Sequence, residues 1–220
     1  KWEVKEDNSR ISVLVNENID YRRRKDLERP HIAAIWIEIC PKLKNPILVC
    51  NQYREWRILG VEGSHLHAPN EERWKVFVEV LKSVANSGQE FHWMGDINLN
   101  RDRWQQVALQ RLDDDSDSGY DSDTGQQRPP FRPEWWQKLV DHLYSEVMSD
   151  HPEVVQLVKK PTWFKKTDTG PKSSTLDLYF TNQPLKLTSL AIMNAVKSDH
   201  CMLVAHRRTQ TKFPKPSIIR

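Results

Sequence analysis

The sequence is poor in cysteine and contains no long apolar run. Its three cysteines, Cys40, Cys50 and Cys201, cannot all pair with one another and do not have the spacing of a metal site. We therefore expect reduced thiols in an intracellular protein. No stretch approaches the ~20 apolar residues that a membrane-spanning helix needs, and the first residues do not have the pattern of a signal peptide. These absences argue against a disulfide-rich secreted scaffold and against a membrane protein.

Charge is unevenly distributed along the chain. The 33 basic and 30 acidic residues give a net charge of +3, but residues 113–127 contain six aspartates and no base, so the remaining residues carry +9. A basic body favours a polyanionic substrate, although many proteins with neutral ligands are equally basic. The acidic segment lacks the Gly and Glu that an EF-hand loop starting at Asp113 would need. We expect a disordered insert there rather than a calcium loop or a phosphorylation target.

Apolar periodicity predicts one layered domain of the α/β or α+β class over residues 1–220. Two stripes at helical spacing predict helices, one that starts at Asn70 as its N-cap and ends near Asn86, and one over residues 133–149. A charged turn is expected over residues 21–28. Short runs rich in β-branched residues predict strands at 11–15, 32–39, 47–50, 91–94, 154–158, 176–180, 190–194 and 202–206. The apolar runs indicate a sheet that is covered on both faces.

Three short motifs carry residues suited to chemistry. Met94-Gly95-Asp96-Ile97-Asn98 follows an apolar run, and its glycine would let the backbone approach a substrate. The side chains of Asp96 and Asn98 are two residues apart and would project to the same side of an extended segment. A carboxylate that can position water, beside an amide that can donate to a phosphoryl oxygen, suits phosphodiester hydrolysis. A turn capped by Asp and Asn is the alternative.

The other two motifs lie near the C-terminal strands. Ser198-Asp199-His200 precedes the last apolar run and combines a carboxylate that can hold Mg²⁺ with an imidazole that titrates near neutrality. Asp177 interrupts the apolar strand Leu176–Phe180, where a buried carboxylate needs a partner. A surface turn and an edge-strand aspartate facing water are the respective alternatives.

Together these motifs resemble the endonuclease/exonuclease/phosphatase superfamily. The order is a strand with G-D-x-N, then an S-x-L-D strand, then S-D-H near the C-terminus. Further stretches resemble the endonuclease domain of LINE-like, non-LTR retrotransposons, and the resemblance covers the whole chain except the acidic insert. These stretches are Ser9–Val15, Asp26–Glu28 with Ala34–Ile39, Leu157–Thr162 and Leu176–Asn182.

The resemblance implies a role for each matching residue. Asp96 would position or deprotonate the attacking water, Asn98 would bind a phosphate oxygen, and Asp199 would help to hold the metal. His200 would stabilise the charge on the phosphate, and Asp177 would orient His200. At the edge of this group, Tyr53 would donate to the scissile phosphate, Arg54 is a candidate phosphate clamp, and Ser198 would lie just outside, toward the DNA.

The resemblance also implies features outside these motifs. Family members begin with a strand that carries an active-site Asn and a strand that ends in a metal-binding Glu, and both precede the region matching Ser9–Val15. Glu3 and Glu6 stand in the wrong context, so we expect those first strands and that Glu to be missing from this sequence. Related nucleases have a DNA-contacting hairpin where Trp163, Lys165, Lys166 and Lys172 lie here, although an ordinary basic hairpin has the same composition.

The sequence thus predicts a two-sheet α/β sandwich flanked by helices, of the DNase I-like kind. The implied activity is Mg²⁺- or Mn²⁺-dependent nicking of double-stranded DNA in the nucleus. The nick would prime a reverse transcriptase carried by the same polyprotein. Two alternatives stay open: a phosphatase or phosphodiesterase of the same fold, and a catalytically inactive fragment that retains a DNA-binding surface.

Overall fold

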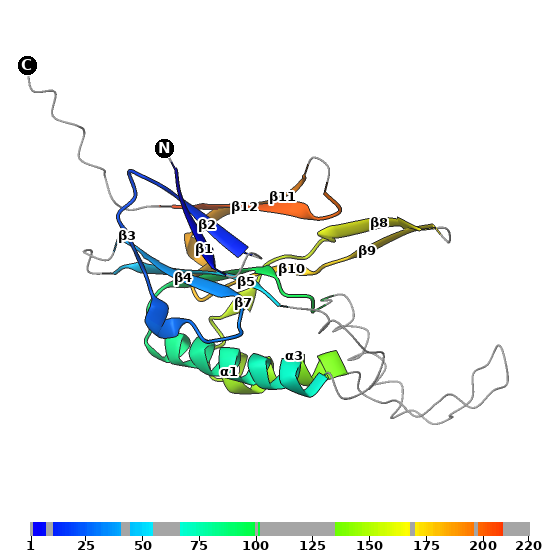
Figure 1. Ribbon diagram of the computed structural model, residues 1–220, viewed down its shortest axis with the longest axis horizontal. Coiled ribbons are helices and arrows are strands. Elements are labelled where there is room, and N and C mark those ends of the chain that lie inside the picture. Colours follow the sequence, from blue (N-terminus) through cyan, green and yellow to red (C-terminus); the bar gives the residue numbers. More distant parts are fainter. Residues whose placement is uncertain are drawn as a thin grey trace, which may run out of the picture.

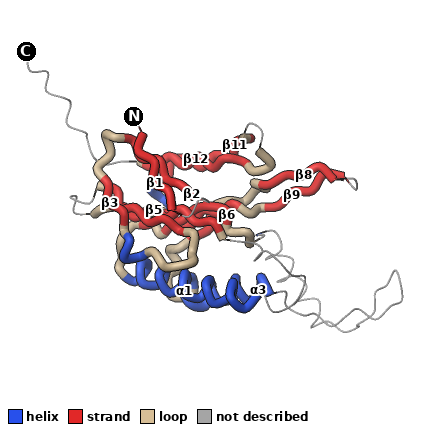
Figure 2. The backbone as a smooth tube through the Cα atoms, viewed as in Figure 1, coloured by secondary structure: helices blue, strands red, loops and turns tan. Residues whose placement is uncertain are grey.

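The fold is layered, with helices on one side of a central sheet and two β-ribbons on the other (Figures 1 and 2). The computed structural model describes residues 2–7, 11–40, 45–54, 67–99, 101, 135–167, 170–195 and 198–208. The acidic insert at 113–127 lies outside these ranges. None of the helices in the described parts of the chain is long and apolar enough to cross a membrane.

The central sheet has six strands in the order β3-β4-β5-β6-β10-β7. Strands β5 and β6 are parallel and are joined through α1, whereas the other neighbours are antiparallel. The strands are β3 (Tyr21–Arg23), β4 (Ala34–Ile39), β5 (Ile47–Tyr53), β6 (Phe91–Asp96), β7 (Val155–Gln156) and β10 (Asp177–Thr181). Five of the six residues of β4 are buried, as expected for a strand covered on both faces.

Helices α1 (His67–Asn86) and α3 (Trp135–Leu143) cover one face of this sheet, and a π-helical turn, η3 (Tyr144–Met148), continues α3. Aromatic side chains fill the space between the helices and the sheet: the rings of Trp93 and Phe180 stack with centroids 4.4 Å apart. The indole N–H of Trp74 donates to the Leu139 carbonyl at 2.8 Å and joins the two helices. The main core therefore lies on the helical side.

Two ribbons cover the opposite face. One pairs β1 (Trp2–Asp7) with β2 (Ile11–Asn16), and Val15 packs there with Ile35 and Ile37 of β4 in a second, smaller core. The other pairs β11 (Leu187–Asn194) with β12 (Cys201–Arg207) and follows a short 3₁₀ turn, η4 (Pro184–Lys186). A separate hairpin of β8 (Trp163–Thr167) and β9 (Gly170–Ser174) extends from one end of the sandwich (Figure 1).

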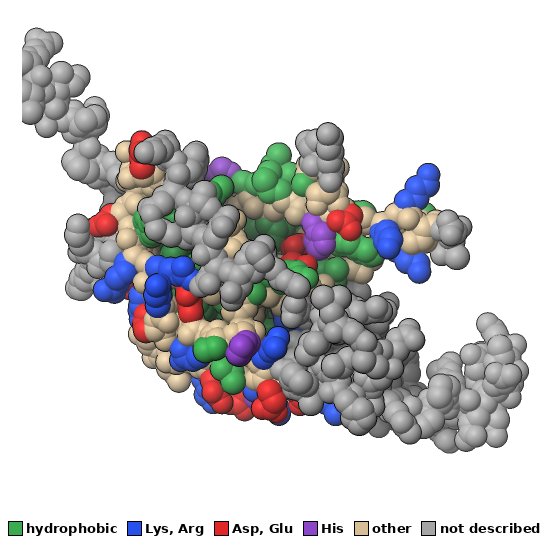
Figure 3. Space-filling view, viewed as in Figure 1, with side chains coloured by type: hydrophobic (Ala, Val, Ile, Leu, Met, Phe, Trp, Pro, Cys, Tyr) green, Lys and Arg blue, Asp and Glu red, His purple; other side chains and the backbone are tan. Residues whose placement is uncertain are grey.

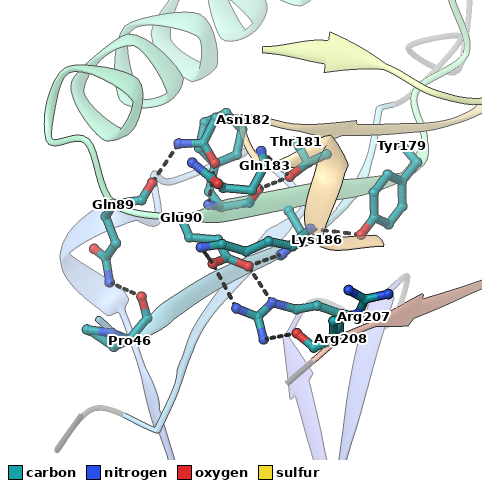
Figure 4. Close-up of polar contacts among 12 residues, drawn as sticks. Pro46, Gln89, Glu90, Tyr179, Thr181, Asn182, Gln183, Lys186, Arg207 and Arg208 are labelled. Carbon is teal, nitrogen blue, oxygen red and sulfur yellow. Dashed lines mark hydrogen bonds and ion pairs between the residues drawn. The ribbon is translucent and has the colours of Figure 1, made fainter. Parts of the chain in front are cut away.

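A buried carboxylate ties the β11–β12 ribbon to the central sheet (Figure 4). Glu90, just before β6, is 7% exposed and accepts hydrogen bonds from Arg207 at the end of β12 and from Lys186 Nζ at 2.7 Å. His92 Nε2 lies 3.0 Å from the same carboxylate, and His92 Nδ1 lies 2.8 Å from the hydroxyl of Tyr179. Although burial alone would raise the pKa of Glu90, these partners hold it well below its usual range.

The predicted fold class is confirmed, with corrections to individual elements. Residues 21–28 are not simply a charged turn, because they form β3 and the 3₁₀ turn η1 (Lys25–Leu27). The arginines of β3 are accommodated at this sheet edge by ion pairs with Glu38 and Glu28. The prediction of Asn70 as a helix cap is wrong, since α1 begins at His67.

We expect Glu90→Gln to lower the free energy of unfolding at neutral pH by roughly 2 kcal/mol, because it removes the buried carboxylate that accepts charged hydrogen bonds from the partly exposed Lys186 and Arg207. The contribution of a carboxyl with a depressed pKa is present above the ordinary Glu pKa of about 4.3 and is lost as pH falls below it. The wild-type protein should therefore lose this stabilisation in acid, and the variant has none to lose. Urea unfolding from neutral to acidic pH measures both effects.

Glu146→Gln is the matched control, since Glu146 forms a half-exposed ion pair with Lys82. An equal loss of stability in both variants would show that the Glu90 cluster contributes no more than a surface pair.

Candidate active site

Three neighbouring strands deliver polar side chains to the same end of the central sheet. Tyr53 is the last residue of β5 and pairs in register with Asp96, the last residue of β6. Asp177, the first residue of β10, pairs with Asp96 from the other side. The register alone therefore places the three residues in one row across the sheet, as the sequence motifs predicted for a single site.

His200 reaches this row from the ribbon on the other layer. Its Nδ1 lies 2.9 Å from Asp177 Oδ2, and possible ligand atoms of Asp96, Asp177 and His200 all lie within 4.8 Å of one another. A β-bridge between His200 and Trp163 fixes the backbone beside them. The predicted hydrogen bond between Asp177 and His200 is confirmed, and it joins the two sheets at the site.

The close approach of these groups shifts their pKa values. Burial, followed by the charge of Asp177, raises the pKa of Asp96 to about 6, against the opposing effect of His200. Burial lowers the pKa of His200, but the hydrogen bond and charge of Asp177, with the charges of Asp96 and Asp199, outweigh it and raise the pKa. The raised pKa of Asp96 thus lies near neutrality, and the raised pKa of the neighbouring His200 favours the protonated imidazole.

The loop after β6 is fixed by Arg54 and Asn98. Arg54 is 5% exposed, and its guanidinium donates to the carbonyls of Ile97 at 2.6 Å and Asn98 at 2.7 Å. Asn98 has a φ of 52°, its amide Nδ2 donates to the Arg54 carbonyl at 2.7 Å, and its N–H donates to Asp96 Oδ1 at 3.2 Å. The sequence predicted that Arg54 clamps a phosphate; because it is buried and bonded to these carbonyls, it positions the Asp96 loop instead.

Gly95 allows two strands to come together rather than the substrate approach that its motif suggested. Its φ is +138°, and a Cβ at this position would lie 1.9 Å from the carbonyl oxygen of Gln52 on the parallel strand β5. A side chain here would push β6 away from β5, and Asp96 would move with it.

Two positioning contacts are not evident from the sequence. The hydroxyl of Thr162, which is fully buried, accepts hydrogen bonds from the backbone N–H groups of Leu176 and of Asp177. The indole N–H of Trp163 donates to Asp199 Oδ2 at 2.9 Å. Thr162 lies in a stretch that carries the family resemblance, which is the one signal that could have pointed to it. For Trp163 the sequence suggested a DNA contact or an ordinary hairpin position, and not a bond to Asp199.

Asp199 and Ser198 lie at the mouth of the site. Both are exposed, and with Phe164, Asn194 and His200 they line a cavity of about 450 Å³. The backbone N–H of His200 donates to Ser198 Oγ at 3.0 Å. Among the described residues, the cluster of possible metal-ligand atoms comprises Asp96, Asp177 and His200, and it does not include Asp199. Its metal-binding role therefore stays a prediction.

The β8–β9 hairpin carries the predicted lysines. Lys165 and Lys172 lie directly opposite one another in the register, so their side chains share one face, whereas Lys166 pairs with Pro171 on the other. All three lysines are exposed, and basic side chains are visible at this end of the molecule in Figure 3. The hairpin therefore presents positive charge beside Trp163 and the site.

Solved structures similar to this chain include a retrotransposon endonuclease domain, an exonuclease and an AP endonuclease. The endonuclease domain of TRAS1, a telomere-specific non-LTR retrotransposon, superposes with a TM-score of 0.55 at 13% identity, over 91% of this chain and 74% of that chain. A 3′-5′ exonuclease (NExo) from Neisseria meningitidis gives 0.49 at 13% identity, over 86% and 70%. An AP endonuclease from Archaeoglobus fulgidus gives 0.47 at 15% identity, over 88% and 71%. The similarity to the TRAS1 domain shows the fold.

No family model matches the sequence, and it matches no curated protein. The DNase I-like fold expected from the three motifs is confirmed.

We expect Asp177→Asn to lower the pKa of His200, because it removes the carboxylate whose hydrogen bond and charge raise that pKa. Asp199→Asn should lower the pKa of His200 less, since the charge of Asp199 is the weakest of the four influences that raise it. Imidazole titration by NMR measures both. If Asp199→Asn had the larger effect, the hydrogen bond from Asp177 would not be the main partner of His200 in solution.

Proposed function

We propose that this chain, which has the DNase I-like fold of the endonuclease/exonuclease/phosphatase superfamily, is a nucleic-acid phosphodiester hydrolase, and specifically a metal-dependent endonuclease that nicks DNA. The observation that carries the proposal is the convergence of Asp96, Asp177 and His200 at one end of the sheet. A carboxyl poised near neutrality beside a hydrogen-bonded imidazole provides a general base and a cation within reach of one reacting group.

In the proposed reaction Asp96 positions the attacking water and accepts a proton from it. The water oxygen bonds to phosphorus, the P–O3′ bond breaks, and the 3′ oxygen takes up a proton from solvent, so the products are a 3′-hydroxyl and a 5′-phosphate. His200, held by Asp177, places its charge where negative charge develops on the phosphoryl oxygens. Tyr53, in the same row, would donate to the scissile phosphate.

In this proposal the side-chain amide of Asn98 both fixes the loop after β6 and binds the substrate. One amide hydrogen fixes the loop through the Arg54 carbonyl. The NH₂ group of an asparagine has a second hydrogen, and that one would bind a phosphate oxygen.

The donor set of the site fits a divalent cation that prefers oxygen ligands, Mg²⁺ or Mn²⁺. Asp96 and Asp177 repel one another across paired strands, and this repulsion contributes to the raised pKa of Asp96. A cation among the carboxylates would remove that repulsion, and Asp199 would add the oxygen that Trp163 does not hold. When bound, such a metal polarises the phosphoryl oxygen and stabilises the leaving oxygen.

Double-stranded DNA is the proposed substrate because positive charge lies beside the site. The body of the chain carries +9 outside the acidic segment, and the β8–β9 hairpin presents Lys165, Lys166 and Lys172. For a retrotransposon enzyme, the 3′-hydroxyl at the nick would prime reverse transcription by a reverse transcriptase of the same polyprotein. That role would place the protein in the nucleus.

The activity prediction concerns nicking of supercoiled plasmid in Mg²⁺. We expect Asp96→Asn to lower the nicking rate by roughly 10²- to 10⁴-fold, because it removes the carboxylate proposed to accept the proton of the attacking water.

Lys138→Gln, an exposed change on α3, is the control and should nick like the parent. Nicking that survives Asp96→Asn would refute the proposed role of Asp96.

A further prediction concerns the substrate. Replacing Lys165, Lys166 and Lys172 together by Ala should weaken duplex DNA binding almost equally across sequences. It should also flatten the dependence of log affinity on log salt by roughly 0.9 for each phosphate that the lysines neutralise. A salt titration of affinity measures this slope. An unchanged slope would make the hairpin a bystander and favour a small-molecule phosphatase.

A further inference from the structure

A second cavity lies at the same end of the central sheet as the candidate active site. It has a volume of about 360 Å³ and is formed by the segment that leads from η1 into β4. Its described lining residues are Ile11, Lys25, Glu28, Arg29, Pro30, His31, Ile32, Ala33 and Ala34. No feature of the proposed mechanism uses this cavity.

The charge around the cavity is positive after local ion pairs are taken into account. Glu28 is the one acid among the described lining residues, and its carboxylate is engaged by Arg23 at 2.8–3.2 Å. Lys25, Arg29 and His31 are exposed. The basic lining residues thus outnumber the acid, and the acid is already neutralised.

The guanidinium of Arg29 is held in place by the loop itself. Its NH1 donates to the carbonyls of Asp26 at 2.8 Å and Glu28 at 3.1 Å. An arginine has five N–H donors in a planar fork, so this anchoring leaves other donors for an anion. Arg29 is therefore partly preorganised, which lowers the entropy lost when a ligand binds.

His31 adds a sign of strain at the same place. Its φ is 65°, a backbone conformation that non-glycine residues rarely adopt. Such strain is found preferentially at ligand-binding segments, and here it falls on a residue that lines the cavity.

The pairing of the strands fixes the position of the cavity relative to Asp96. Ala34 pairs with Gln52 of β5, and Gln52 pairs with Gly95 of β6, the residue before Asp96. The N–H of Tyr53 also donates to the Ala33 carbonyl at 2.9 Å. Two strand spacings, about 10 Å, therefore separate the edge of the cavity from the Asp96 strand. The β8–β9 hairpin lies on the other side, where Thr162 contacts the start of β10.

We propose that Lys25, Arg29 and His31 form a second phosphate subsite, which binds a backbone phosphate of the DNA strand on the side of the nick opposite the hairpin. This inference rests on the proposed function and extends it. A separation of about 10 Å corresponds to roughly three nucleotides along the axis of B-DNA. The substrate strand is thereby held on both sides of Asp96, by the hairpin on one side and by this cavity on the other.

The test is the binding of a short fluorescein-labelled DNA duplex without divalent metal, so that the readout does not depend on catalysis. The double variant Lys25→Gln/Arg29→Gln should flatten the salt slope by roughly 0.9 for each phosphate that the two side chains neutralise. Lys25→Gln alone should flatten it more than Lys138→Gln, which removes the same charge from α3 on the helical face. Circular dichroism and thermal melting confirm that each variant is folded.

A second arm locates the contact. The probes are duplexes that each carry one neutral methylphosphonate, placed at a different position in each. The wild-type protein should bind more weakly when the methylphosphonate lies at one position on the side of the nick opposite the hairpin. The double variant should show no loss of affinity at that position. If the wild-type protein binds no duplex, both the subsite and the proposed function fail. Suppose that replacing Lys165, Lys166 and Lys172 by Ala flattens the salt slope, whereas Lys25→Gln/Arg29→Gln has the same slope as Lys138→Gln. The subsite is then overturned and the proposed function stands.

Discussion

The ion pairing of Glu90 is the constraint on which the site depends, because the site is assembled from two layers. Glu90 immediately precedes β6, and Asp96 is the last residue of that strand. Strand β12 begins immediately after His200 and ends at Arg207. The bond between Glu90 and Arg207 therefore holds the two strands together at one end, about 20 Å from the end where His200 meets Asp177. Buried carboxylates need complete pairing, so this contact tolerates few relative positions of the ribbon and the sheet.

Around the candidate site, hydrogen bonds between side chains and backbone groups hold the loops in a fixed position. Arg54 and Asn98 bind each other's segments, and Thr162 receives the first N–H groups of the Asp177 strand. These residues need not touch a substrate to matter, since a reacting group displaced by about 1 Å loses much of its effect. The candidate site is therefore better described as three converging side chains, Asp96, Asp177 and His200, on a rigid hydrogen-bonded support.

Sequence reasoning succeeded where local pattern and spatial position coincide. Asp96, Asp177 and His200 each adjoin an apolar strand, so their order along the chain was enough to suggest one site, and the resemblance supplied the pairing of Asp177 with His200. It failed where the deciding partner is distant in sequence. The burial of Arg54 depends on carbonyls 43 and 44 residues away, and the Trp163 bond depends on Asp199, 36 residues away. The strand β3 escaped notice because its arginines are compensated by Glu28 and Glu38, which a hydropathy pattern does not register.

The opposed lysines of the β8–β9 hairpin have an energetic consequence of their own. Lys165 and Lys172 face one another across two strands, where like charges repel and weaken the pairing. An anion that binds between the two lysines removes this repulsion. Part of its binding free energy therefore comes from relief of the repulsion between Lys165 and Lys172. The hairpin is thereby least stable when empty, and occupancy and local folding are thermodynamically linked.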